Sequence, residues 1–134
     1  MILVIGGYAQ GKLEYVKSKY NISDEDIYDF EKSDDLKLEN NLKEIISDKQ
    51  IVFNNVNYLI KNVIEDKNID IIFERLIHNY PNAIIITDEV GNGVVPIDKN
   101  ERLLRETIGR MQCKMAENAN EVIRVVCGIG QRIK

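Results

Sequence analysis

The sequence contains few of the residues that build metal centres or disulfide frameworks. Among its 134 residues there are two cysteines and one histidine, and tryptophan is absent. Cys113 and Cys127 have no cysteine or histidine neighbour at zinc-site spacing, so we predict no zinc site and two reduced, partly buried thiols. His78 lies late in an amphipathic segment, where a role at the surface or at a helix end is expected rather than catalysis.

Long apolar runs and an excess of positive charge are also missing. No run approaches the roughly 20 apolar residues that span a bilayer, and the apolar start is too short for a signal peptide. The net charge of −4 argues against an extended nucleic-acid surface. We therefore predict a cytoplasmic protein with no membrane or nucleic-acid partner. Its length and its 44% apolar content fit a single globular domain over residues 1–134.

Short apolar runs alternate with amphipathic segments along the chain. The runs that predict strands are residues 2–6, 27–30, 50–53, 83–87 and 122–127. Gly128-Ile129-Gly130 is expected to break the last strand. The segments that predict helices are residues 12–19, 31–48, 56–65, 68–81 and 99–118. Continuous apolar strands are typical of parallel sheets covered by helices, so we predict an α/β fold with a three-layer, mostly parallel sheet and helices on both faces.

The most informative motif follows the first predicted strand. Residues 6–13 read Gly-Gly-Tyr-Ala-Gln-Gly-Lys-Leu, close to the phosphate-loop pattern G-x-x-x-x-G-K-[ST]. Backbone N–H groups and the start of the next helix would surround a phosphate, and Lys12 would neutralise its charge. The predicted nucleotide-binding residues are Gly6, Gly7, Tyr8, Ala9, Gln10, Gly11, Lys12 and Leu13. The fold is then similar to that of P-loop NTPases; a tight turn without a ligand is the alternative.

Two positions weaken the metal site that accompanies this motif. Leu13 replaces the serine or threonine hydroxyl that usually ligates Mg²⁺. Asn54, at the end of another predicted strand, gives an amide where an acidic metal ligand is expected. We therefore predict no metal site among the chain's own residues, and any Mg²⁺ would come with bound ATP or GTP. A turn in which asparagine caps the following helix is the alternative for Asn54.

An acidic, glycine-containing loop follows the strand at residues 83–87. Asp88 and Glu89 leave the strand, and Glu89 could accept a proton from a substrate hydroxyl or position a water molecule. Gly91 and Gly93 predict a loop that bends sharply or closes over a ligand. A solvated acidic turn is the alternative.

Basic residues follow on the next predicted helix. Asp98 and Glu101 form a capping-box pattern at its start. Arg102 and Arg105 share one face of this helix and could clamp phosphates or pair with the two carboxylates of the preceding loop. A solvated basic face is the alternative, and we favour it for Arg110.

Together these motifs resemble the bifunctional adenosylcobinamide kinase and adenosylcobinamide-phosphate guanylyltransferase family of cobalamin biosynthesis. The resemblance is carried by Asp-Glu-Val-Gly-Asn-Gly-Val-Val-Pro at 88–96, by Arg-Leu-Leu-Arg-Glu-Thr-Ile-Gly-Arg at 102–110 and by Val-Val-Cys-Gly-Ile-Gly at 125–130. It implies a kinase that uses a nucleoside triphosphate to phosphorylate the aminopropanol hydroxyl of adenosylcobinamide. It also implies GMP transfer through a modified histidine, and assembly into homo-oligomers.

The resemblance also assigns roles to residues of this chain. It implies phosphate contacts for Gly6, Gly7, Gly11 and Lys12, a neighbouring loop at Glu89, Gly91 and Gly93, and a phosphate-contacting or conformational role for Arg102 and Arg105. The segment that corresponds to the family's guanylylated histidine, residues 29–49, contains no histidine. We therefore predict that guanylyltransfer is lost, while the chain could still carry out kinase-type phosphoryl transfer. The alternatives are a non-catalytic nucleotide- or corrinoid-binding regulatory protein and a structural protein that keeps the fold.

Overall fold

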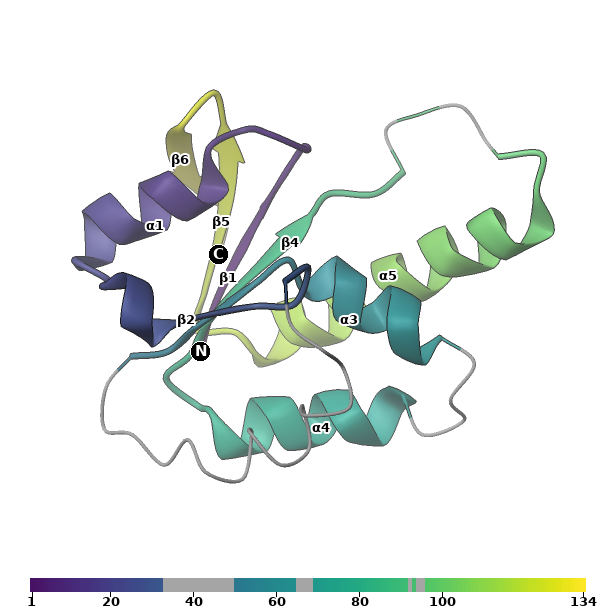
Figure 1. The fold of residues 1–134 in the computed structure, drawn as a ribbon, viewed down its shortest axis with the longest axis horizontal. Helices are drawn as coiled ribbons and strands as arrows, with labels where there is room; N and C mark the ends of the chain where they lie inside the picture. Colours follow the sequence, from purple (N-terminus) through teal and green to yellow (C-terminus); the bar gives the residue numbers. More distant parts are fainter. Residues whose placement is uncertain (33–49, 65–68, 92, 94–95) are drawn as a thin grey trace.

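The chain forms a six-stranded sheet with the order β2-β3-β4-β1-β5-β6 (Figure 1). The computed structural model describes residues 1–32, 50–64, 69–91, 93 and 96–134. The strands are β1 (Ile2–Gly6), β2 (Ile27–Asp29), β3 (Val52–Asn54), β4 (Ile84–Asp88), β5 (Glu121–Val126) and β6 (Ile129–Arg132). Neighbours pair in parallel except β5 and β6, which pair antiparallel. The predicted mostly parallel α/β sheet is therefore confirmed.

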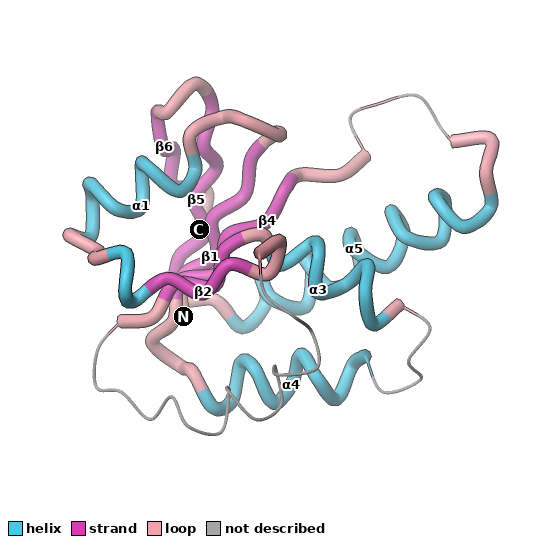
Figure 2. Tube along the Cα trace, in the orientation of Figure 1, coloured by secondary structure: helices cyan, strands magenta, loops and turns pink. Residues whose placement is uncertain are grey.

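Helices cover both faces of this sheet, as predicted (Figure 2). The helices are α1 (Lys12–Tyr20), α3 (Val56–Val63), α4 (Ile69–Asn79) and α5 (Lys99–Asn118), with a short 3₁₀ helix at Asp24–Asp26. Helix α1 packs on one face, whereas α3, α4 and α5 pack on the other. The helix predicted at 31–48 falls mainly on residues outside the described part of the chain. Asn68, the first residue of the helix predicted at 68–81, also lies outside it. None of the helices in the described ranges is long and apolar enough to cross a bilayer.

Alternating side chains of the central strands build the two cores. In β1, Leu3 joins the core beneath α3, α4 and α5, while Val4 joins the core beneath α1. In β4, Ile85 joins the core beneath α3, α4 and α5, while Ile86 joins the core beneath α1. Fully burying such a side chain contributes about 1.5–3 kcal/mol, so helices on both faces stabilise the strand that carries the predicted phosphate loop.

The carboxyl ends of the central strands meet at one edge of the sheet. The register sets Gly6 of β1 opposite Asp88 of β4, and the Glu89 N–H donates to the Gly6 carbonyl at 2.9 Å. A side chain at Gly6 would place its Cβ 2.3 Å from the Val125 carbonyl oxygen of β5. Glycine is therefore needed here because the backbones of β1 and β5 approach too closely for any other residue.

The helix after the acidic loop begins where its capping pattern predicts. The Asp98 carboxylate accepts hydrogen bonds from the backbone N–H groups of Asn100 at 2.8 Å and Glu101 at 3.0 Å. Such a cap is worth about 1 kcal/mol because it satisfies N–H groups that lack partners within the helix. The cap fixes the start of α5 and thereby the end of the loop that leaves β4.

The C-terminal segment differs from the predicted fold. Gly128-Ile129-Gly130 does not end the sheet, because β5 turns at Cys127 and Gly128 into the additional strand β6. Both turn residues have positive φ, 51° for Cys127 and 77° for Gly128, which is typical of a two-residue hairpin turn whose twist matches the strands. Glycine gives the expected turn residue at the second position. Cysteine at the first gives no such signal, and both Cys113 and Cys127 are exposed rather than partly buried.

Candidate functional site

The segment between β1 and α1 forms a tight loop at the carboxyl edge of the sheet. Helix α1 begins at Lys12, and its N-cap, Gly11, has the left-handed φ of 77°. Ala9 is also left-handed, at φ 55°. The first N–H groups of a helix lack partners within it and lie at the positive end of its dipole. The predicted strand–loop–helix therefore forms, with geometry suited to an anion.

The turn of the β5–β6 hairpin holds one side of this loop. The Gly128 N–H donates to the Gln10 carbonyl at 2.9 Å, and the Cys127 N–H donates to the Gln10 side-chain oxygen at 2.8 Å. A Cβ at Gly11 would lie 3.4 Å from the Gly128 Cα. These contacts join residues at opposite ends of the chain, so no local sequence pattern could have revealed them.

Lys12 is the buried cation of the site. It is 7% exposed, and a buried ammonium requires charged or polar partners. Its Nζ donates to the Asp88 Oδ1 at 2.6 Å and to the Gly7 carbonyl at 2.8 Å. Sequence analysis did not select Asp88 as a site residue, although its place at the end of an apolar strand was the available signal.

An unpartnered amide oxygen lies beside this ion pair. Asn57, in the first turn of α3, donates through Nδ2 to the Asp88 Oδ2 at 3.4 Å, whereas its buried Oδ1 has no partner among the residues that the structure describes. Among the described residues, no group of three or more His, Cys, Asp or Glu could hold a metal. The Asp88 carboxylate and the Asn57 oxygen still fit Mg²⁺, which binds to one or two carboxylates together with substrate phosphates.

Asn54 does not lie beside the phosphate loop, contrary to the interpretation made from the sequence. It ends β3, and β4 separates β3 from β1. Its Nδ2 donates to the Asp29 Oδ2 at 3.1 Å, and Asn55 donates to the other oxygen of Asp29 at 2.9 Å. Asn55 is the residue at the start of α3, and its side chain makes no cap. The carboxylate next to the phosphate loop is therefore supplied by β4, not by β3.

A tyrosine extends this polar network to Glu31. The Tyr58 hydroxyl donates to the Glu31 carboxylate at 3.0 Å. This hydrogen bond and the negative charge of Glu31 raise the pKa of Tyr58 above its usual value. Asn55 also donates to Glu31, at 3.2 Å. The polar groups at the ends of β2 and β3 thus bind mainly to one another.

Glu89 pairs with a residue that sequence analysis did not select. Arg124 of β5 donates to the Glu89 carboxylate through Nε at 3.1 Å and through Nη2 at 3.0 Å. Arg102, which was predicted to clamp phosphates or pair with Asp88 or Glu89, instead donates to the carbonyls of Pro96 at 2.9 Å and Ile97 at 2.7 Å.

The remaining predicted residues are spread over the adjoining loop and helix. Gly91 has a φ of 100°, in keeping with a sharp bend. A Cβ at Gly93 would lie 3.8 Å from the Arg105 guanidinium nitrogens, so this arginine lies against the loop. Arg110 pairs with Asp70 of α4 at 3.0 Å. Tyr8, at the tip of the phosphate loop, is 79% exposed.

Comparison with known proteins places these features in a family. Residues 29–133 match the family model described as "Cobinamide kinase / cobinamide phosphate guanyltransferase". The bifunctional adenosylcobalamin biosynthesis protein CobU of Escherichia coli (strain K12) is 45% identical over 52 residues, and that of Salmonella typhimurium (strain LT2) is 42% identical over 52 residues. Each match covers 39% of this chain and 29% of the relative, so it spans well under half of those proteins.

The matched stretch contains β3, β4, α5 and the hairpin, whereas the phosphate loop precedes its first residue. Interpretation of that loop therefore depends on its own geometry. Since the family model covers more than half of the chain, the protein belongs to the cobinamide kinase / cobinamide phosphate guanyltransferase family.

Proposed function

We propose that this protein binds ATP or GTP at the phosphate loop and transfers the terminal phosphoryl group to a hydroxyl of a cobinamide-type corrinoid. The observation that carries the proposal is the position of Lys12, whose buried ammonium lies within the loop between β1 and α1. Membership of the cobinamide kinase family supplies the substrate class. The relatives' names describe adenosylcobalamin biosynthesis, which is the process proposed here.

Binding of a triphosphate would replace one partner of Lys12. In the structure its Nζ is held by Asp88 and Gly7, and a phosphate oxygen would take the place of the Asp88 carboxylate. Loop N–H groups and the α1 N-terminus would add donors around the same phosphates. Phosphoryl transfer depends mainly on positioning and on such electrostatic stabilisation, so these groups would account for most of the catalysis.

Release of Asp88 from Lys12 would give it a second role. A carboxylate that loses its cationic partner becomes available to a metal, and Asn57 Oδ1 is unpartnered beside it. Asp88 and Asn57 would therefore hold Mg²⁺, in place of the hydroxyl that Leu13 lacks. When bound, the ion would neutralise phosphate charge during transfer.

Glu89 stays the proposed proton acceptor for the substrate hydroxyl. It follows Asp88 at the same edge of the sheet. Arg124 holds its carboxylate at 3.0 Å, so Glu89 would have to leave this ion pair to reach a hydroxyl, and we expect its contribution to be modest. That expectation agrees with the limited need for a base in loose phosphoryl-transfer transition states.

We also propose that the guanylyltransfer activity is absent. His78, the one histidine of the sequence, is exposed near the end of α4. Helix α4 leads into the amino end of β4, whereas the phosphate loop lies beside that strand's carboxyl end. His78 is thus at the opposite edge of the sheet from the site.

The test is nucleotide binding and turnover with matched lysine variants. Lys12→Ala should lower ATP or GTP affinity by about 10- to 100-fold, because it removes a charge-assisted hydrogen bond. Lys17→Ala, on the same helix with its ammonium on Asp24, should bind as wild type does. Phosphorylation of adenosylcobinamide should require Lys12. Equal nucleotide affinity of Lys12→Ala and wild type would show that the phosphate loop is not the binding site.

A non-catalytic nucleotide-binding protein is the second candidate. Leu13 favours it, because its side chain packs against the core beneath α1 rather than offering a hydroxyl to a metal. This candidate predicts binding that depends on Lys12, with no phosphorylated corrinoid formed at any Mg²⁺ concentration.

A further inference from the structure

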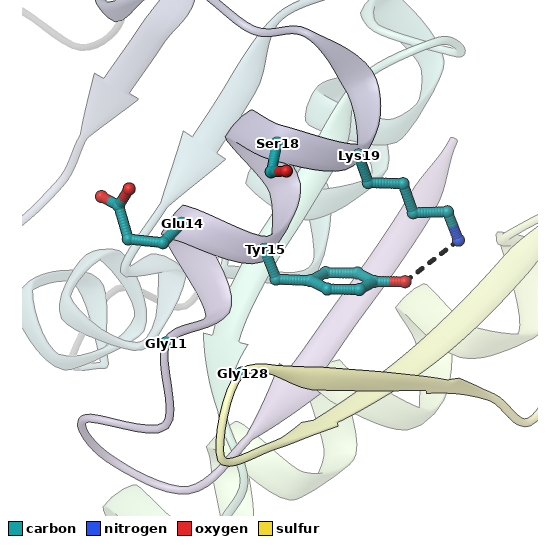
Figure 3. A pocket seen from close by; sticks show the side chains of 6 residues that line it. All are labelled: Gly11, Glu14, Tyr15, Ser18, Lys19 and Gly128. Carbon is teal, nitrogen blue, oxygen red and sulfur yellow. Dashed lines mark hydrogen bonds between the residues drawn. The ribbon is translucent and has the colours of Figure 1, made fainter.

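We propose that the nucleoside of the bound nucleotide occupies the pocket between α1 and the β5–β6 hairpin (Figure 3). This inference rests on the proposed function, since it takes the phosphates to lie in the loop. The pocket has a volume of about 360 Å³, within the usual range for small-molecule sites. Its lining residues are Gly11, Glu14, Tyr15, Ser18, Lys19 and Gly128.

The pocket begins where the phosphate loop ends. Gly11 is both the last loop residue and part of the pocket wall, and Gly128 of the hairpin faces it. On the other side of the loop, Lys12, Asp88 and Asn57 are linked to one another. A nucleotide with its terminal phosphates near Lys12 therefore finds a lined recess beside the first turns of α1.

One wall of the pocket is held in place by close packing. A Cβ at Gly130 would lie 2.1 Å from the Tyr15 Cζ and 2.4 Å from its hydroxyl oxygen. Only glycine at this position of β6 lets the Tyr15 ring lie so close to the strand. The ring is fixed further because Lys19 Nζ donates to the Tyr15 hydroxyl at 3.0 Å. The pocket thus contains an aromatic surface of the kind on which bases pack.

Polar groups line the pocket away from this ring. Figure 3 shows Glu14 and Tyr15 leaving α1 in different directions, with Ser18 on the next turn. The exposed Glu14 carboxylate can accept hydrogen bonds from ribose hydroxyls or ring N–H groups. The Ser18 hydroxyl can donate or accept. An aromatic wall with a few polar groups is suited to a nucleoside and not to inorganic phosphate alone.

Comparison of two ligands separates the pocket from the loop. Isothermal titration would measure GTP and inorganic tripolyphosphate binding to wild type, Tyr15→Leu and Ser18→Trp. Tyr15→Leu removes the ring, and Ser18→Trp fills the recess from an exposed position that requires no core rearrangement. Both variants should bind GTP about tenfold more weakly, while their tripolyphosphate affinity stays that of wild type. Ser23→Trp, at an exposed serine outside the pocket lining, is the matched control and should bind both ligands as wild type does.

The outcomes distinguish the two proposals. Unchanged GTP affinity in both Tyr15→Leu and Ser18→Trp, or an equal loss for both ligands, would overturn the nucleoside pocket and leave the phosphate loop intact. Wild-type protein that binds neither of these ligands nor ATP would overturn the proposed function itself. Thermal unfolding of each variant would establish that a loss of GTP binding is not a loss of fold.

Discussion

The two flanks of the phosphate loop are built from different chemistry. The sheet flank, formed by Lys12, Asp88 and Asn57, is charged and held by side chains. The hairpin flank, formed by Gln10, Tyr15 and the turn and first residues of β6, is held mainly by backbone N–H groups and close packing, together with the hydrogen bond from Lys19 to the Tyr15 hydroxyl. Side-chain ion pairs can exchange partners, whereas close backbone packing cannot.

This difference suggests that the two flanks bind different parts of a nucleotide. The sheet flank, whose ion pair can open, suits phosphates and their metal, because the negative phosphate takes the place of the Asp88 carboxylate on Lys12. A flank of fixed shape suits the uncharged nucleoside, which is recognised by fit and by a few hydrogen bonds. Predictions that break one flank and spare the other test the division.

The largest effect is expected where β5 approaches the start of the loop. Gly6→Ala would put a Cβ 2.3 Å from the Val125 carbonyl oxygen. Relief of this clash requires the backbone of β1 or β5 to move. We expect the free energy of unfolding to fall by about 1–3 kcal/mol, measured by urea denaturation. The control is Gly109→Ala in α5, where the nearest atom would be 3.8 Å away. That change should raise stability by up to about 1 kcal/mol, and a similar loss in both variants would contradict the close approach.

The sheet flank is tested by Asp88→Asn. Without Mg²⁺, the variant should bind GTP about 5- to 10-fold more tightly, because a negative charge that competes for Lys12 is gone. With Mg²⁺ the wild type should gain affinity and the variant should not. Titration calorimetry in EDTA and in Mg²⁺ measures both. Asp70→Asn, whose carboxylate pairs with Arg110 and Lys114, should behave as wild type in both buffers.

Gln10→Ala should loosen the hairpin flank by a smaller amount. It removes the acceptor of the Cys127 N–H and should cost about 0.5–1.5 kcal/mol of local stability. Hydrogen exchange at the Cys127 amide should become faster. Gln50→Ala, which removes a side-chain bond to the Asn82 carbonyl, should leave that amide unchanged; faster exchange in both variants would indicate general loosening instead.

The smallest effect concerns Tyr58, outside both flanks. Its folded-state pKa is raised by the hydrogen bond to Glu31. The stabilisation it contributes is therefore present below the ordinary tyrosine pKa of 10.0 and is lost as pH rises through the folded value. Ultraviolet titration of Tyr58→Phe against wild type should reveal this late-ionising tyrosine. Glu31→Gln should return the pKa of Tyr58 toward its ordinary range. An unchanged pKa in this variant would exclude the hydrogen bond between Tyr58 and Glu31.

Local patterns predicted the parts of the structure that depend on local chemistry. Glycines and Lys12 after an apolar strand indicated the loop and helix, and Asp98 indicated the start of α5. Each of these depends on a few consecutive residues. Continuous apolar strands indicated the parallel sheet for the same reason, because burial on both faces leaves a signal in every strand.

Strand order left no such signal. Asn54 and Asp88 both end apolar strands, and only the placement of β4 next to β1 shows that Asp88 lies beside the loop. The contacts of Gln10 with Cys127 and Gly128 connect the two ends of the chain. The sequence shows a glycine at position 130 but not why glycine is needed there, because the cause is a tertiary contact with the Tyr15 ring.

The most direct test of the divided site is a nuclear Overhauser spectrum of the GTP complex. We expect contacts between the base or ribose protons of GTP and the Tyr15 ring, which lines the hairpin pocket. Contacts to the Tyr58 ring instead would place the nucleoside on the far side of the loop, beside Glu31. That result would contradict the division of the nucleotide between a charged flank and a fixed hairpin flank.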